Sequence, residues 1–128
     1  MSAQPSNLQL WSGRILTGLP VLMLVFSAAM KLKGGPELEQ GFNHLGLPVS
    51  LAMPLGILEL GVTALYLLPR TAVLGAILVT GYLGGAMTAH VRIHEAWFIQ
   101  FLLGVMIWGG LYFRDSRIRG LIPMTPPA

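Results

Sequence analysis

The sequence contains no cysteine and little charge. Without cysteine the chain has no disulfide, no CxxC redox pair, no thiolate metal site and no cysteine nucleophile. Only 10% of its 128 residues are Asp, Glu, Lys or Arg, whereas 54% are hydrophobic. A water-soluble domain of this length cannot bury so much apolar surface. We therefore interpret residues 1–128 as a single membrane domain.

Motifs of common catalytic sites are also missing. The sequence has no phosphate-binding loop, no H-E-x-x-H pattern and no Ser-His-Asp arrangement. Its net charge of +3 does not indicate nucleic acid, because the basic residues stand at the edges of apolar blocks and form no stripe. We expect no nucleic-acid partner, and the sequence leaves open whether the protein is an enzyme.

Four long apolar blocks are present instead. Each is near the roughly 20 residues that a helix needs to cross hydrocarbon, which predicts an all-α, transmembrane four-helix bundle. The predicted spans are about 14–32, 49–68, 71–91 and 96–113. Pro20 and Pro54 lie inside spans one and two, where a missing amide should bend each helix. A cleavable signal sequence is the alternative for the first block, and we expect the Pro-rich end, 123–128, to be disordered.

The loop between spans one and two has a helical pattern of its own. Leu38, Phe42 and Leu45 recur at i, i+4 and i+7, Pro36 suits a helix start and Gly46 a helix end. This pattern predicts a short amphipathic helix at the outer membrane surface.

Lysine and arginine are unequally divided between the two ends of the bundle. The end with both termini carries Arg14, Arg70, Arg114, Arg117 and Arg119, whereas the opposite end carries Lys31, Lys33 and Arg92. The positive-inside rule then places both termini in the cytoplasm. We expect a multi-pass protein of the cell inner (plasma) membrane, surrounded by membrane lipid.

One acid, Glu59, interrupts the second span near its middle. An ionised carboxylate there costs roughly 2.5 to 3.5 kcal/mol, so it should face the bundle interior and be protonated or paired. Tyr82 of span three lies at nearly the same depth, and its phenol could donate to Glu59. Ser27 and Lys31 share one face of span one, but the helix register is uncertain by a turn, so no Lys31–Glu59 pair is predicted. We take Glu59, Tyr82, Ser27 and Lys31 as candidate ligand-binding residues, with helix packing as the alternative role of Glu59.

Three histidines gather on the outer side. His90 and His94 are spaced i, i+4 and could reach one ion on a helix face, with His44 as the third nitrogen. Neutral histidines at a membrane interface are common, so we favour an ordinary interfacial role and predict no metal site, although the sequence does not decide whether the three bind a metal.

Small residues in span three include Gly81 and Gly85 in a G-x-x-x-G arrangement, which lets two helices approach closely. We favour packing within the bundle as their role, with homodimerisation as the alternative.

Several stretches together resemble the DoxX-like family of small bacterial membrane proteins. They are "RILTGLPVLMLVFSAAMKL", "HLGLP", "LGILELGVTALYLLPRTAVLGAILVTGYLGGAMTAHVR" and "LLGVMIWGGLYFRD". The strongest pieces are Lys31-Leu32, the Gly56, Glu59 and Pro69 pattern, and Gly84-Gly85-Ala86.

The resemblance implies a four-helix transmembrane bundle. The founding relatives are described as subunits of a quinone-linked oxidoreductase, and others associate with redox-defence partners. Some redox-active relatives use cysteines. Since this chain has none, the resemblance implies at most a quinone-facing or scaffolding role for Ser27, Lys31, Glu59 and Tyr82.

Three functions remain open at this point. The first is a redox-associated subunit that binds a quinone or another lipophilic molecule in the bundle and takes electrons from a partner protein. The second is a proton-coupled small-molecule transporter that uses Glu59. The third is a ligand-free membrane scaffold whose polar groups only specify packing.

Overall fold

The structure is a computed structural model that describes residues 6–121, and these residues form helices and no strand. The elements are α1 (Asn7–Lys33), α2 (Pro36–Leu45), the 3-10 turn η1 (Val49–Leu51), α3 (Ala52–Leu67), α4 (Ala72–Arg92), α5 (Phe98–Arg114) and α6 (Ser116–Leu121). The predicted all-α fold is confirmed. The Pro-rich end at 123–128 lies outside the described residues.

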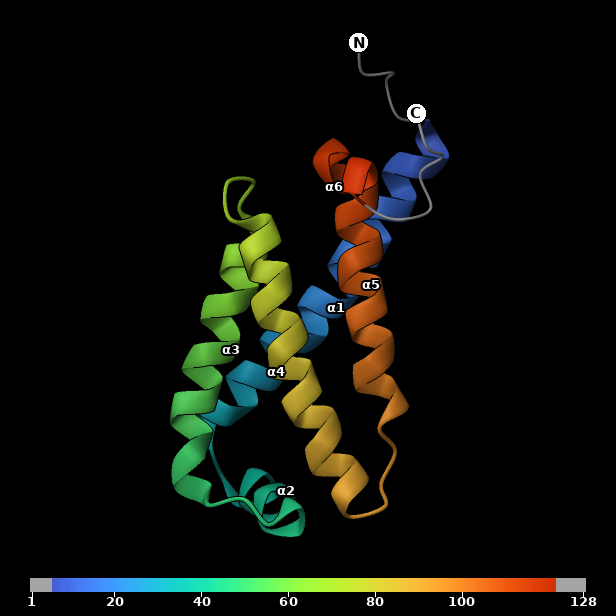
Figure 1. The fold of residues 1–128 in the computed structure, drawn as a ribbon. Helices are drawn as coiled ribbons and strands as arrows, with labels where there is room; N and C mark the ends of the chain where they lie inside the picture. Colours follow the sequence, from blue (N-terminus) through green and yellow to red (C-terminus); the bar gives the residue numbers. More distant parts are fainter. Residues whose placement is uncertain (1–5, 122–128) are drawn as a thin grey trace.

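The four long helices form a closed ring. Helix α1 packs on α3 and α5, and α4 packs on the same two helices from the other side. Figure 1 shows α2 and the α4–α5 connection at one end of this bundle. The turn between α3 and α4, the start of α1 and the short helix α6 lie at the other end.

The outer surface of the bundle is apolar, as lipid requires. Leu22 and Phe26 of α1 are each 68% exposed, and Ile57 of α3 is 60% exposed. Three segments are long and apolar enough to cross a membrane, namely Asn7–Lys33, Val49–Leu67 and Ala72–Arg92. Helix α5 is equally apolar but has 17 residues, about 25 Å at the α-helical rise. The protein is a membrane protein built as a helical bundle.

The first helix begins seven residues earlier than the predicted span of 14–32. Ser6 caps it: the Ser6 hydroxyl accepts from the Gln9 amide at 3.2 Å, and the Gln9 side chain accepts from the Ser6 amide at 3.1 Å. This reciprocal capping box starts the helix within polar sequence, where hydropathy gives no signal. The short helix α6 was not predicted either, and it is held by Ile118, which is 3% exposed.

The two prolines occupy different positions in their helices. Pro20 lies inside α1 and is buried. Pro54, which we expected to bend the interior of the second span, lies in the first turn of α3 after the 3-10 turn. Amides in a first turn have no partner within the helix, so Pro54 removes no hydrogen bond from α3.

Helix α2 confirms the short amphipathic helix that the sequence predicts. Pro36 occupies its first turn, and Gly46 ends it in the left-handed conformation with φ of 74°. Phe42 is buried at 6% exposure, and Leu38 and Leu45 are half-buried on the same face. The apolar face of α2 therefore packs against the bundle.

Candidate ligand-binding site

A lysine and a glutamate form an ion pair between α1 and α3. The Lys31 ammonium nitrogen, Nζ, lies 3.1 Å from Oε1 of Glu59 and 2.6 Å from the hydroxyl of Ser27. The side chain of Glu59 is 2% exposed and that of Lys31 is 15% exposed. Glu59 thus faces the interior, as predicted, and Lys31 turns inward to meet it.

Gly56 permits this pairing, because it lets α1 approach α3 closely. A Cβ atom at Gly56 would lie 3.1 Å from Cβ of Lys31 and 3.2 Å from the carbonyl oxygen of Ala28. Since Gly56 precedes Glu59 by about one helical turn, the crossing point of the two helices sets Lys31 beside the carboxylate.

Tyr82 of α4 completes the cluster. The Lys31 ammonium lies 5.9 Å from the centre of the Tyr82 ring, within the range of a cation–π contact. The structure therefore brings together all four residues that the sequence singled out, Ser27, Lys31, Glu59 and Tyr82.

Two threonines at a similar depth point elsewhere. The Thr63 hydroxyl donates to the backbone oxygen of Glu59 at 2.7 Å, a bond within α3. The Thr80 hydroxyl accepts from the indole nitrogen of Trp108 at 2.7 Å and so links α4 to α5. Neither contributes a side-chain contact to the carboxylate of Glu59.

A cavity of about 440 Å³ adjoins this cluster. Its polar side chains are Lys31, Tyr82 and His90, and the rest of its wall is apolar or small. The remaining lining residues are Phe42, Leu45 and Leu47 from α2 and its loop, Leu51 and Leu55, and Gly81, Gly85, Ala86 and Ala89 of α4. Lys31 and Tyr82 join the cavity to the ion pair, since Lys31 is a member of the pair and the Tyr82 ring lies beside the Lys31 ammonium.

The glycines of α4 help to make the cavity rather than a helix contact. A Cβ atom at Gly81 or Gly85 would meet no other atom within 4 Å. The expectation that these two glycines pack helices within the bundle is therefore wrong. Close helix approaches occur at other glycines, such as Gly75, where an added Cβ would lie 2.2 Å from the Tyr66 backbone nitrogen.

Two side-chain contacts fix helix α2 beside the cavity. The imidazole of His44 pairs with the carboxylate of Glu95, and the guanidinium of Arg92 donates to the backbone oxygen of Leu45. The first contact joins α2 to the segment that follows α4, and the second joins it to the last residue of α4. They hold Phe42 and Leu45 in place as part of the cavity wall.

The three histidines have separate surroundings. His44 pairs with Glu95, Nδ1 of His90 lies 2.8 Å from the carbonyl oxygen of Ala86, and His94 occupies a tight turn with φ of 61°. Within residues 6–121, no three His, Cys, Asp or Glu side chains gather closely enough to hold a metal ion.

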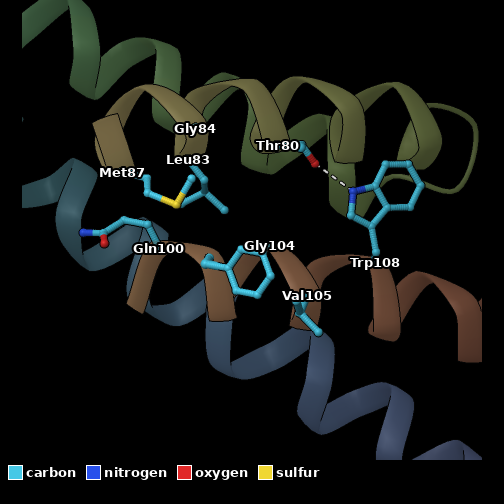
Figure 2. A pocket seen from close by; sticks show the side chains of 9 residues that line it. Thr80, Leu83, Gly84, Met87, Gln100, Gly104, Val105 and Trp108 are labelled. Carbon is cyan, nitrogen blue, oxygen red and sulfur yellow. Dashed lines mark hydrogen bonds between the residues drawn. The ribbon is translucent and has the colours of Figure 1, made fainter. Parts of the chain in front are cut away.

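A second cavity of about 450 Å³ lies between α4 and α5 (Figure 2). Its wall is almost wholly apolar, and the Trp108–Thr80 hydrogen bond crosses one side of it. None of the four predicted residues lines it, and it contains no charged side chain. Its polar lining side chains are Thr80, Gln100 and Trp108, and the amide oxygen of Gln100 is buried without a hydrogen-bond partner among the described residues.

The sequence missed the part of the site that α2 supplies. The spacing of Leu38, Phe42 and Leu45 predicted an amphipathic helix, but this spacing does not indicate which surface the apolar face of the helix covers. His90 was expected to have an ordinary interfacial role, with metal binding as the alternative, and no sequence signal placed it in the same cavity as Lys31 and Tyr82.

Comparison with known proteins gives one match. A family model described as the DoxX-like family matches residues 15–110. No curated protein and no solved structure matches the chain. The matched range includes the ion pair and all the residues that line the first cavity.

Proposed function

We propose that this chain, which belongs to the DoxX-like family, binds a lipophilic small molecule with an uncharged polar head, such as a quinone, in the cavity beside Lys31 and Tyr82. The observation that carries this proposal is the combination of an apolar cavity of about 440 Å³ with these two polar side chains in its wall. Small-molecule sites commonly have such volumes, with an apolar lining and a few polar groups that orient the ligand.

The ion pair supports an uncharged head group. An ammonium has three N–H donors, and Lys31 directs two of them to Ser27 and Glu59. One donor is left for the cavity. Because Glu59 already balances the charge of Lys31, an anionic ligand would compete with this carboxylate, whereas a carbonyl oxygen accepts the remaining bond without separating the pair.

A redox role would depend on a second protein. The chain has no cysteine, so it offers no thiol for electron transfer. Any electrons that reach a bound quinone would have to come from a redox partner, and this chain would supply the binding site and its orientation.

Binding can be tested with a short-tail ubiquinone added to the protein in nanodiscs. We expect saturable binding and a raised unfolding temperature. Tyr82→Phe removes one hydroxyl and Lys31→Gln removes the ammonium, so each should weaken binding. Lys33→Gln is the matched control, because Lys33 is exposed at the same helix end. No saturable binding in the wild type, or equal losses in Lys31→Gln and Lys33→Gln, would refute the proposal.

A ligand-free scaffold is the second candidate, and the ion pair favours it directly. Lys31 and Ser27 give Glu59 a partner without any ligand, so packing alone can account for a buried acid. The quinone titration separates the two, since a scaffold binds none.

A proton-coupled transporter would need Glu59 to separate from Lys31 during each transport cycle. Its test is the Glu59→Gln variant in proteoliposomes, which should lose pH-driven uptake.

We propose that the protein lies in the cell inner (plasma) membrane with both termini in the cytoplasm. Five arginines at the end with the termini, against three cations at the other, support this by the positive-inside rule. A reporter that is active on one side of the membrane only, fused after residue 128, tests it.

A further inference from the structure

A depression of about 330 Å³ lies where the α3–α4 turn meets α5 and α6. This is the end of the bundle opposite α2 (Figure 1). Its lining residues are Pro69, Ala72, Leu111, Arg114, Asp115 and Arg117. Ala72 and Leu111 belong to the buried core, so the floor is apolar. The rim carries two guanidinium groups and one carboxylate.

Arg114 is held in position by Tyr66, and its charge also acts on the neighbouring Asp115 carboxylate without a close ion pair between them. Its Nη2 atom donates to the backbone oxygen of Tyr66 at 2.9 Å, and its guanidinium lies 4.4 Å from the centre of the Tyr66 ring. Tyr66 is fully buried and donates its hydroxyl to the backbone oxygen of Ile107 at 2.5 Å. Within residues 6–121, Arg114 forms no ion pair. Its other N–H donors are available to an anion.

Arg117 is held in a fork by Asp115. Its Nε lies 3.1 Å from Oδ1 and its Nη2 lies 2.7 Å from Oδ2 of that carboxylate. The hydrogen bonds from Arg117 lower the pKa of Asp115, which therefore stays ionised at neutral pH. Two cations and one anion leave the depression with one net positive charge. Arg14, Arg70 and Arg119 add to the positive field of this end of the molecule.

We propose that this depression binds the phosphodiester head group of an anionic phospholipid. The ends of membrane-spanning helices lie at the depth of lipid head groups, and guanidinium groups bind phosphate oxygens with matched geometry. The apolar floor suits the glycerol and upper acyl region of the same lipid. The net positive charge favours an anionic lipid over a zwitterionic one. This proposal does not depend on the quinone site.

The test is lipid titration of the detergent-purified protein, followed by native mass spectrometry. Phosphatidylglycerol should bind roughly five times more tightly than phosphatidylcholine. Arg114→Gln and Arg117→Gln should each weaken phosphatidylglycerol binding roughly five- to tenfold. Asp115→Asn should strengthen it severalfold, because Arg117 is then released toward the phosphate. The Asp115 variant keeps the test informative if Arg114→Gln disturbs folding.

Arg14→Gln is the matched control. It removes the same charge from the same end of the bundle, but Arg14 lies over the Trp11 ring rather than in the depression. Equal losses in Arg14→Gln and Arg114→Gln would show diffuse surface attraction and overturn the proposal. Displacement of the lipid by millimolar inorganic phosphate would show a free-phosphate site and also overturn it, as would weaker binding in Asp115→Asn.

Discussion

Lys31 and Glu59 place two opposite charges where water reaches neither of them freely. The carboxylate is almost wholly buried, whereas the ammonium keeps 15% of its side chain exposed. Burial removes hydration from both groups, and their attraction together with the Ser27 hydrogen bond offsets that cost. The two members of the pair therefore depend on each other, and removal of one should be worse than removal of both.

We expect Lys31→Met to lower the free energy of unfolding by about 3 kcal/mol, because it leaves Glu59 buried without a cation. The double variant Lys31→Met with Glu59→Leu should recover most of this loss. Reversible unfolding in mixed detergent micelles, followed by circular dichroism, measures both. Lys33→Met controls for a change of charge at the same helix end. A double variant as unstable as the single one would contradict the pairing.

Helices α1 and α3 meet where α3 has no side chain. An added methyl group at Gly56 would press on Cβ of Lys31 and on the Ala28 carbonyl. Gly61 lies on the same helix, but an added methyl there would meet nothing within 4 Å. The two positions therefore separate the effect of helix approach from that of helix propensity.

We expect Gly56→Ala to destabilise the protein by about 1 kcal/mol through overpacking. Gly61→Ala should be neutral or should stabilise it by up to about 1 kcal/mol, since alanine is the better helix former. Thermal unfolding in one detergent compares the two variants. If both shift the midpoint in the same direction by the same amount, Gly56 is not needed for the helix crossing.

Helix α2 is joined to the end of α4 and to the segment after it by side-chain contacts near the cavity. The His44–Glu95 pair is exposed, with 62% and 42% of the two side chains accessible, so it adds little to global stability. It acts instead on the local opening of α2.

Glu95→Gln should accordingly increase hydrogen exchange of the α2 amides severalfold without a measurable change in the unfolding midpoint. Glu37→Gln is the control, because Glu37 is an exposed acid in the first turn of α2. Hydrogen exchange followed by mass spectrometry reads both variants. Unchanged α2 exchange in Glu95→Gln would mean that the His44–Glu95 pair does not limit the opening of this helix.

Across the molecule as a whole, the face of α4 that carries Gly81 and Gly85 could serve either of two roles. It forms the wall of the cavity in a single copy, and a G-x-x-x-G face also suits contact with a helix of a second copy. Gly84 of the same helix faces the other cavity, between α4 and α5. An added Cβ atom at Gly84 or Gly85 meets no other atom within 4 Å, so we expect substitution at neither position to prevent folding.

We expect Gly85→Leu to fill the first cavity and abolish binding of the short-tail ubiquinone, while Gly84→Leu leaves that binding intact. The unfolding midpoint and the mass by light scattering should not change in either variant. Conversion of a wild-type dimer to a monomer by Gly85→Leu would instead assign this face to homodimerisation.

The bundle and its polar residues could be predicted because each has a local cause. Hydropathy marks the long apolar helices, the spacing of Leu38, Phe42 and Leu45 marks α2, and the cost of a buried acid makes Glu59 face inward. The start of α1 was missed, although the Ser6–Gln9 capping box was present in the sequence.

Partner choice, by contrast, was decided only by the tertiary structure. Whether Lys31 reaches Glu59 depends on where α1 crosses α3, and a shift of one turn moves a side chain by about 5.4 Å. Whether Gly81 and Gly85 touch a helix or border a cavity depends on where α2 docks. Hydropathy is summed along one segment and carries no information on the register between segments. Composition and pattern therefore determined the helices of this protein, whereas packing between the helices determined its candidate site.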